Sequence, residues 1–200
     1  MNDTDRQARR RQIIDAVVRT TTGGGLQAAT FRSIAKEAGV SVRLVQYYFG
    51  TKDQLLAETL LDVGKRAVQR ISRAIEHLGP DPSPNEKITT IFEQLLPLDD
   101  ERREAMLVFI ALRTASLTDD SLRSPDETGL DASLIQTTAD ELERAVASGA
   151  ARHGLDPDPE SIMLVATLTG IANGLLAGTF TRDEASNSLQ YAIDLSLPPG

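Results

Sequence analysis

The sequence predicts an all-α fold, in which an N-terminal three-helix head with a helix-turn-helix is joined by a long helix to a C-terminal helical body. Apolar residues recur at intervals of three and four, and no stretch sustains the period-two alternation of a strand. Ser, Thr or Asp precedes several of these periodic segments, and Gly or Pro ends several of them. Two of the segments are short and are separated by a three-residue turn that contains Gly, as in a helix-turn-helix.

The first helix is expected over residues 8–22, where apolar residues pair at i, i+4 spacing. The three glycines at 23–25 end it. A phosphate-binding loop is the less favoured interpretation of these glycines, because no strand precedes them and no Gly-Lys-Ser/Thr follows.

The helix-turn-helix is expected over residues 30–49. Thr30 is placed to cap a helix that starts at residue 31, and Gly39 is placed to end that helix in the left-handed region. Ser41 is placed to cap a second short helix over residues 42–49.

A long helix follows, over residues 51–78. Thr51 and Gln54 form a capping-box pattern at its start, and the Pro-rich segment "GPDPSPN" ends it. At a rise of about 1.5 Å per residue, this helix spans on the order of 40 Å and can connect a head to a body.

The sequence after residue 78 predicts five more helices. Asp158 and Pro159 are expected as the N-cap and first-turn pair of the fourth of these, and Thr181 with Glu184 as the capping box of the last, which ends before "PPG". The first four cover residues 86–96, 101–116, 131–153 and 158–180.

The charge of the chain is divided unevenly. The net charge of the whole chain is −8, which would argue against a polyanionic partner. Residues 1–52, however, hold nine Lys or Arg against four Asp or Glu, a net of +5, so the remainder carries −13. A basic head on an acidic body indicates local binding to nucleic acid.

Several classes of protein and site are disfavoured. The chain has no cysteine, which excludes disulfides, thiolate zinc sites and cysteine nucleophiles. No converging set of acid, base or metal-ligating groups is visible, so we expect no catalytic site, no metal and no cofactor. The N-terminus leads into no apolar segment of a signal peptide, and no apolar run approaches about 20 residues, so a cytoplasmic protein without a membrane span is expected.

The helix over residues 42–49 divides its side chains between two faces. At 100° per residue, Val42, Val45 and Phe49 form a core stripe, and Arg43 and Tyr47 point away from it. The remaining side chains lie on the flanks, and among them Tyr48 can pack its ring while its hydroxyl reaches outward. The outward face could read DNA bases and phosphates or could be an ordinary solvated surface; the two-helix spacing and the local charge favour DNA.

The segment "TFRSIAKEAGVSVRLVQYYFGTKDQLL", residues 30–56, resembles the DNA-binding head of the tetracycline-repressor (TetR) family of bacterial regulators. The resemblance covers roughly residues 7–67, and it implies a DNA-binding domain there and a regulatory and dimerisation domain over residues 68–200. The segment "DPESIMLVATLTGIANGLLAGTFTRDEASNSLQYAIDL" looks like the C-terminal body of members similar to the choline-responsive, BetI-like repressors.

The resemblance implies DNA contacts from nine residues. Gln46 departs from the family pattern, where many members have Tyr, so the base preference is not transferred. Thr21 also departs, because an aromatic core residue is common there. The base-facing residues are expected to be Val42, Arg43, Leu44, Gln46 and Tyr47, and the phosphate-binding residues Thr30, Arg32, Tyr48 and Lys52.

The helix over residues 158–180 carries a strip of small residues, Ala166, Gly170, Gly174 and Gly178. Each interior Gly costs about 1 kcal/mol relative to Ala, so close approach of another helix is expected. The family pairs through its last two helices, which favours a homodimer contact over packing within one subunit. Arg113, Thr169 and Asn173 are polar residues in apolar segments; they could bind a small-molecule ligand, or could be satisfied by their own surroundings.

We therefore expect a homodimeric transcriptional regulator, a ligand-responsive repressor of a palindromic double-stranded DNA operator. A transcriptional activator and a non-specific architectural DNA binder are the alternatives, and a small helical enzyme is the least favoured. The run Arg9, Arg10 and Arg11 could be a phosphate-binding arm or a solvated face, and the sequence does not separate these two interpretations.

Overall fold

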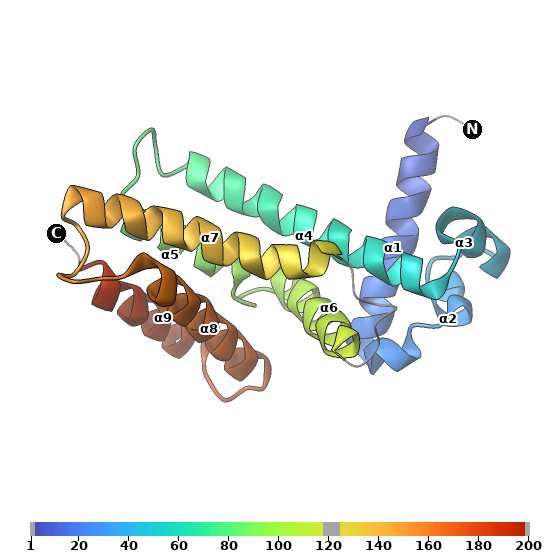
Figure 1. Ribbon diagram of the computed structural model, residues 1–200. Coiled ribbons are helices and arrows are strands. Elements are labelled where there is room, and N and C mark those ends of the chain that lie inside the picture. The colour runs from blue at the N-terminus through green and yellow to red at the C-terminus, as the bar shows by residue number, and fades with distance from the viewer. Residues whose placement is uncertain (1–2, 118–124, 199–200) are drawn as a thin grey trace. The chain divides into compact units, whose positions relative to one another are not determined.

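The computed structural model describes residues 3–117 and 125–198, and the regular secondary structure of these ranges is entirely α-helical (Figure 1). The all-α fold class that the sequence predicts is therefore confirmed. The helices in chain order are α1 (Asp3–Ala28), α2 (Phe31–Glu37), α3 (Val42–Phe49), α4 (Lys52–Glu76), α5 (Pro84–Leu95), α6 (Asp100–Ser116), α7 (Pro125–Ser148), α8 (Pro157–Leu176) and α9 (Arg182–Ser196).

The chain divides into two compact units. The head unit comprises Met1–Arg66 with Glu104–Glu127, and the body unit comprises Ala67–Arg103 with Thr128–Gly200. The sequence did not indicate that the second part of α6 packs with the head. The domain limits inferred above, 7–67 and 68–200, stay a prediction.

The head unit has one apolar core to which five helices contribute. The i, i+4 pairs of α1 point into it, α2 packs against both α1 and α3, and the apolar sides of α2 and α3 join the same core. Val108 and Leu112 of α6 complete it. Large side chains that are almost fully buried in this core include Ile13, Val17, Ile34, Val45, Phe49, Leu55, Leu56 and Val108.

Side-chain caps fix the N-terminal ends of the helices in the head as the sequence predicts. The Thr30 hydroxyl accepts a hydrogen bond from the Ser33 N–H at 3.1 Å, and the Ser41 hydroxyl accepts one from the Leu44 N–H at 3.2 Å. At the start of α4, Thr51 and Gln54 exchange two hydrogen bonds, which completes the expected capping box. The helix starts of the head are therefore set locally.

The expected limits of the first helix are wrong. α1 begins at Asp3, and its helical conformation continues past the first two of the three glycines. The break comes at Gly25, with φ 72° and ψ 176°, before one more turn to Ala28. A helix tolerates an interior Gly at a cost of about 1 kcal/mol, so only the glycine that adopts positive φ interrupts it.

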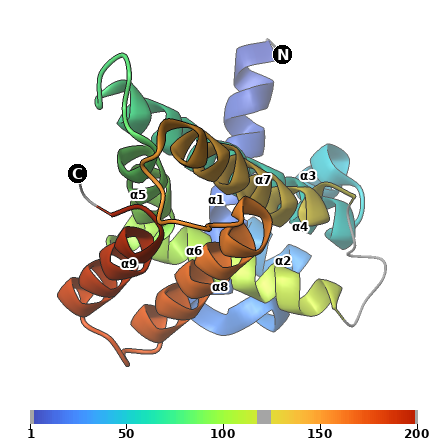
Figure 2. The same ribbon diagram turned by 60° about the vertical axis from the view of Figure 1, so that its left-hand side comes forward.

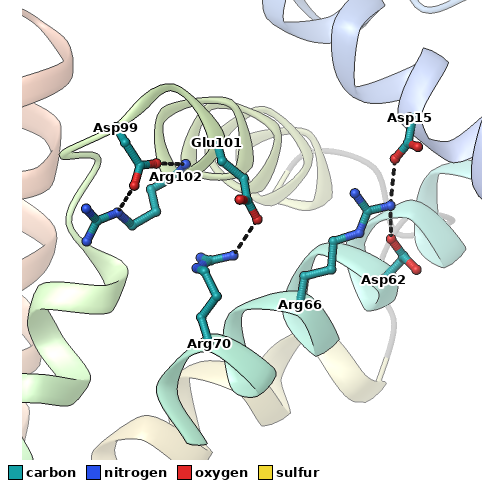
Figure 3. Close-up of polar contacts among 7 residues, drawn as sticks. All are labelled: Asp15, Asp62, Arg66, Arg70, Asp99, Glu101 and Arg102. Carbon is teal, nitrogen blue, oxygen red and sulfur yellow. Dashed lines mark hydrogen bonds and ion pairs between the residues drawn. The ribbon is translucent and has the colours of Figure 1, made fainter. Parts of the chain in front are cut away.

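In the head unit, Arg66 of α4 bridges two carboxylates (Figure 3). Its Nη2 lies 2.6 Å from Asp15 Oδ1 on α1 and 2.6 Å from Asp62 Oδ2 one turn earlier on α4. Burial by itself would lower the pKa of Arg66, but the Asp15 hydrogen bond and the charges of both carboxylates raise it above its ordinary value. This ionic cluster ties α4 to α1.

In the body unit, the next turn of α4 contacts the beginning of α6 (Figure 3). Arg70 Nη1 lies 3.3 Å from Glu101 Oε1. Asp99 caps α6 by accepting from the Arg102 backbone N–H and from its Nε, both at 2.8 Å. Burial would raise the pKa of Asp99, but these hydrogen bonds and the charges of Arg102 and Arg70 lower it.

The body unit is built around α5, α7, α8 and α9. α8 and α9 lie side by side in both views (Figure 2), and α5 packs against α9. The Asn85 side chain of α5 donates to Asp194 Oδ1 at 3.0 Å and to the Leu197 carbonyl at 2.7 Å. Large side chains that are almost fully buried include Ile88, Phe92, Leu142, Leu189 and Ile193.

Several predicted helix limits in the body are corrected by the local capping residues. Asp156 with Pro157 begins α8, instead of the Asp-Pro pair two residues later, because the Asp156 carboxylate accepts from the Asp158 N–H. α8 ends at Leu176, four residues before the expected limit. Likewise α5 begins at Pro84, behind a Ser83 cap, and α7 covers Pro125–Ser148 in place of residues 131–153. The capping box of Thr181 with Glu184 is confirmed.

The two body capping boxes predict an acid-sensitive part of the stability. Backbone and side-chain hydrogen bonds from Ser83 and Thr181 lower the pKa values of Glu86 and Glu184 below the ordinary 4.5. A lowered folded-state pKa contributes stability that is present above the unfolded value and is lost as the pH falls through the folded value. Urea unfolding from about pH 6 to about pH 3 should therefore show a shallower acid loss in the double variant Glu86→Gln, Glu184→Gln.

The Gln substitution keeps the capping box, because Gln is also accepted at this position, and it removes only the titrating carboxyl group. An equal loss of stability on acidification in the variant and the wild type would contradict the assignment.

Candidate nucleic-acid interface

The exposed side of α3 is a compact polar and aromatic surface. Arg43 and Gln46 are exposed, and Tyr47 is 73% exposed. On the opposite side Val45 and Phe49 are buried at 0% and 3% exposure and hold the helix on the core. The predicted separation of Arg43 and Tyr47 from the core stripe matches this burial.

Val42 was predicted to belong to the core stripe, and this prediction is wrong, because its side chain is 37% exposed. It is the first residue of α3, while the apolar contacts of this helix come from its later turns. The helical wheel places Val42 and Tyr48 about 60° on either side of Val45, and it does not register distance along the axis. The position on the core is therefore taken by Tyr48, which is 7% exposed.

The aromatic run at the end of α3 is a stack of three rings. Tyr47 meets Tyr48 edge to face, with ring centroids 5.5 Å apart and planes at 79°, and the centroids of Tyr48 and Phe49 are 6.5 Å apart. The expectation that the Tyr48 ring packs agrees with its burial; the phosphate contact from its hydroxyl stays a prediction. The exposed ring of Tyr47 is thus supported by a buried ring beneath it.

The other predicted DNA contacts lie around α3. Leu44 is half-buried against the head core, while Arg32 is exposed in the first turn of α2. Thr30 is exposed, but its hydroxyl already accepts from Ser33 as the cap of α2. Lys52 is the first residue of α4, where the unpaired backbone N–H groups add positive potential. The phosphate contacts of Thr30, Arg32 and Lys52 stay a prediction.

The small-residue strip of α8 separates into two kinds of position. A Cβ built on Gly174 would lie 2.2 Å from the Phe180 ring, so this glycine is required by packing within the chain. Gly178 lies beyond the helix end with φ +73° and terminates it. Ala166 and Gly170 are exposed, and a Cβ on Gly170 would meet nothing within 4 Å. Only these two remain candidates for close approach of another helix.

Large apolar side chains are also exposed on α8 and on the neighbouring helix α9. Ile162 and Met163 on α8 are 54% and 64% exposed, and Tyr191 and Leu195 on α9 are 67% and 56% exposed. On a helical wheel Ile162, Ala166 and Gly170 fall within about 80° of one another, so they share one face. Tyr191 and Leu195 of α9 were not among the predicted interface residues, although their i, i+4 spacing indicated a shared helix face. We call these four large residues with Ala166 and Gly170 the α8/α9 face.

α8 is also the one helix of the described residues that is long and apolar enough to cross a membrane, contrary to the expectation that no segment would be. Its mean hydropathy reaches 1.2 over an 18-residue window, and 33% of that window is buried within the chain. Core and interface helices of water-soluble proteins pass the same test, so this is weak evidence for a membrane.

The residues suggested for ligand binding belong to two different units. Thr169 and Asn173 are exposed on α8, and the Thr169 hydroxyl donates to the Val165 carbonyl at 2.9 Å. Arg113 is exposed on α6 in the head unit, with its guanidinium 5.8 Å from the Phe109 ring centroid. A groove of about 410 Å³ lies between α1 and α4 and is lined by none of these three residues. Their role toward a ligand stays a prediction.

Two family profiles match the chain. The profile described as "Bacterial regulatory proteins, tetR family" matches residues 13–59, which include α2, α3 and the start of α4. The profile described as "BetI-type transcriptional repressor, C-terminal" matches residues 84–198, more than half of the chain.

Curated relatives carry regulator names. The chain is 35% identical over 107 residues to the HTH-type transcriptional regulator PksA of Bacillus subtilis, and this match covers 54% of the chain and 51% of the relative. It is 34% identical over 113 residues to BetI 1 of Chromohalobacter salexigens, with 54% and 53% covered. The chain thus spans about half the length of these relatives.

Solved structures have the same fold. A TetR-family transcriptional regulator from Rhodococcus sp. is 25% identical with a TM-score of 0.79, and the match covers 94% of this chain and 98% of that one. A transcriptional regulator from Saccharomonospora viridis, solved in complex with choline, is 23% identical with a TM-score of 0.78 and covers 92% and 93%. The second likeness shows the fold alone.

Proposed function

Since this chain belongs to the TetR family of bacterial regulators and has a BetI-type C-terminal part, we propose that it is a transcriptional repressor that binds a near-palindromic operator as a homodimer. The exposed face of α3 carries the proposal. Arg43, Gln46 and Tyr47 project from a helix whose opposite side is buried, so they are held in a fixed arrangement. A guanidinium, an amide and a phenol are suited to base edges in the major groove.

The acidic body is compatible with this assignment. The basic residues concentrate in residues 1–52, where the net charge is +5 within a chain of −8. Phosphate attraction is therefore confined to the head, and the body is repelled by the same polyanion. A non-specific architectural binder would gain more from a uniformly basic surface, so we regard sequence-specific binding as the better proposal.

We propose that the homodimer forms through the α8/α9 face, so that its two heads can bind the two half-sites of the operator. This face exposes four large apolar side chains next to the small residues Ala166 and Gly170. Exposed apolar surface marks an interaction site where it is contiguous, and a second copy would offer the same surface in return. We therefore replace the four-residue strip by Ala166 and Gly170 together with their apolar neighbours.

Control by a small molecule is the third part of the proposal. A ligand that binds the body more tightly in the DNA-free state would shift the population away from operator binding. Choline is the first compound to test, because a fold neighbour was solved with it. The proposal of a repressor is supported by the description of the matching C-terminal profile. An activator would raise transcription of the target gene, whereas a repressor lowers it.

Selection of bound duplexes from a random pool tests the proposed function. The wild-type chain should enrich an inverted repeat with half-sites about 34 to 36 Å apart, one helical turn of DNA. Enrichment of no sequence over the pool, with tight binding to all duplexes, would instead support an architectural binder.

Arg43→Ala should lower operator affinity by about 1 to 3 kcal/mol and relax the preference at one base pair per half-site. The physical reason is the loss of a bidentate contact to one base edge. The measurement is a titration of the operator and of each single-base variant by fluorescence anisotropy.

Lys52→Ala provides the contrast, since a phosphate contact carries no sequence information. It should weaken operator and random duplex alike and reduce the slope of log K against log salt by about 1. Specificity lost from Lys52→Ala and kept in Arg43→Ala would reverse the two assignments.

Gly170→Arg should convert the homodimer to a monomer in sedimentation equilibrium. The position is open within the chain, and replacing an interior helical Gly raises helix propensity by up to about 1 kcal/mol, so the monomer itself should remain folded. A bulky charge on the α8/α9 face prevents the close approach of a second α8.

Ala147→Arg, on an exposed position of α7, is the matched control and should leave the dimer intact. Dimers of unchanged affinity in the Gly170 variant would rule out this face as the interface.

A further inference from the structure

The run of three arginines on α1 is not a single functional unit. Arg9 donates to Gln12 on its own helix at 2.7 Å, and Arg11 is exposed. Arg10, in contrast, has only 29% of its side chain exposed and makes three contacts inside the head unit. Of the two interpretations that the sequence left open, neither describes Arg10.

Arg10 connects α1 to the end of the recognition helix. Its Nη1 donates to the Tyr48 carbonyl at 2.8 Å, and its guanidinium carbon lies 4.6 Å from the Phe49 ring centroid. Its Nη2 pairs with Glu58 of α4. One side chain thus holds α1, α3 and α4 together at a single point.

The Tyr48 carbonyl needs a donor from outside its own helix. The last carbonyls of a helix have no intrahelical partner, and in α3 the cap N–H of Gly50 satisfies Gln46 instead. A cation at a helix C-terminus also interacts favourably with the helix dipole. Arg10 supplies both the hydrogen bond and the charge.

A second side chain of α1 does the same for the first helix of the pair. Gln12 Nε2 donates to the carbonyl of Ala38, the C-cap residue of α2, at 2.7 Å. α1 therefore binds the C-terminal ends of both helices of the helix-turn-helix.

We infer that Arg10 is a positioning residue for DNA recognition, which fixes the last turn of α3 and thereby the orientation of Gln46 and Tyr47. This inference rests on the proposed function. The contact acts at one end of a short helix, and Tyr47 itself rests on the Tyr48 ring. Arg43 lies in the first turn, which the Ser41 cap holds independently.

The consequence is a position-dependent loss of specificity. Arg10→Met retains the aliphatic length and removes the hydrogen bonds and the charge. In duplex selection with the full-length chain, sequence preference should fall at the base pairs where Gln46→Ala and Tyr47→Ala also lower it. Preference should remain at the base pair lost in Arg43→Ala. The ratio of operator to random-duplex affinity should fall by about tenfold or more, the scale of one hydrogen bond to a charged group.

Arg11→Met is the matched control, because it removes the same charge from the next residue of α1, which is exposed. The pattern of base preference in this variant should equal that of the wild type. Arg10→Lys should restore only part of the lost preference, since one ammonium cannot reproduce a fork that bonds a carbonyl and a carboxylate together.

Folding of each variant is checked by urea unfolding at the binding temperature. If Arg10→Met fails to fold, Arg10→Lys and Glu58→Gln carry the test. Glu58→Gln retains the Tyr48 contact but loosens its anchor on α4, so it should produce the same positional pattern more weakly.

Two results would overturn the inference. An equal loss of affinity for all duplexes with an unchanged base preference would make Arg10 a phosphate contact. An unchanged profile and affinity in the folded variant would leave Arg10 without a role in recognition. Failure of the wild-type chain to select any sequence would instead overturn the proposed function on which the inference rests.

Discussion

Attachment of the short helix α3 to the apolar core of the head is the constraint on which the rest of the structure depends. A helix of eight residues is not stable by itself, so its orientation comes from packing. Val45, Tyr48 and Phe49 provide that packing, the Ser41 hydroxyl sets its start, and Arg10 binds its last turn. With its buried side fixed in this way, the opposite side presents Arg43, Gln46 and Tyr47 in one arrangement.

Two arginines of α4 hold this helix on its neighbours through ion pairs. Arg66 ties α4 to α1 through Asp15 within the head unit, and one turn later Arg70 ties it to the start of α6 within the body unit. α4 and α6 each contribute residues to both units. Under the proposed control by a small molecule, these two continuous helices are the segments that would carry a change from the body to the head.

Sequence patterns predicted several features that depend on local chemistry, although the caps at Ser83 and Asp156 were missed. Caps at Thr30, Ser41, Thr51 and Thr181 follow from side-chain hydrogen bonds within four residues, and the core positions of α3 follow from helical periodicity, apart from the exchange of Val42 for Tyr48. Contacts between distant segments were not predictable. The Arg10 bond to residue 48 and the packing of α6 into the head depend on tertiary structure.

Methylation of guanine N7 in the operator duplex is the most direct measurement of the central claim, that the exposed face of α3 reads base edges in the major groove. N7 lies in the major groove, where an inserted helix shields it. We expect protection of guanines in two clusters separated by about one helical turn, with loss of one protected guanine per half-site in Arg43→Ala. Unprotected N7 atoms throughout a tightly bound duplex would contradict it.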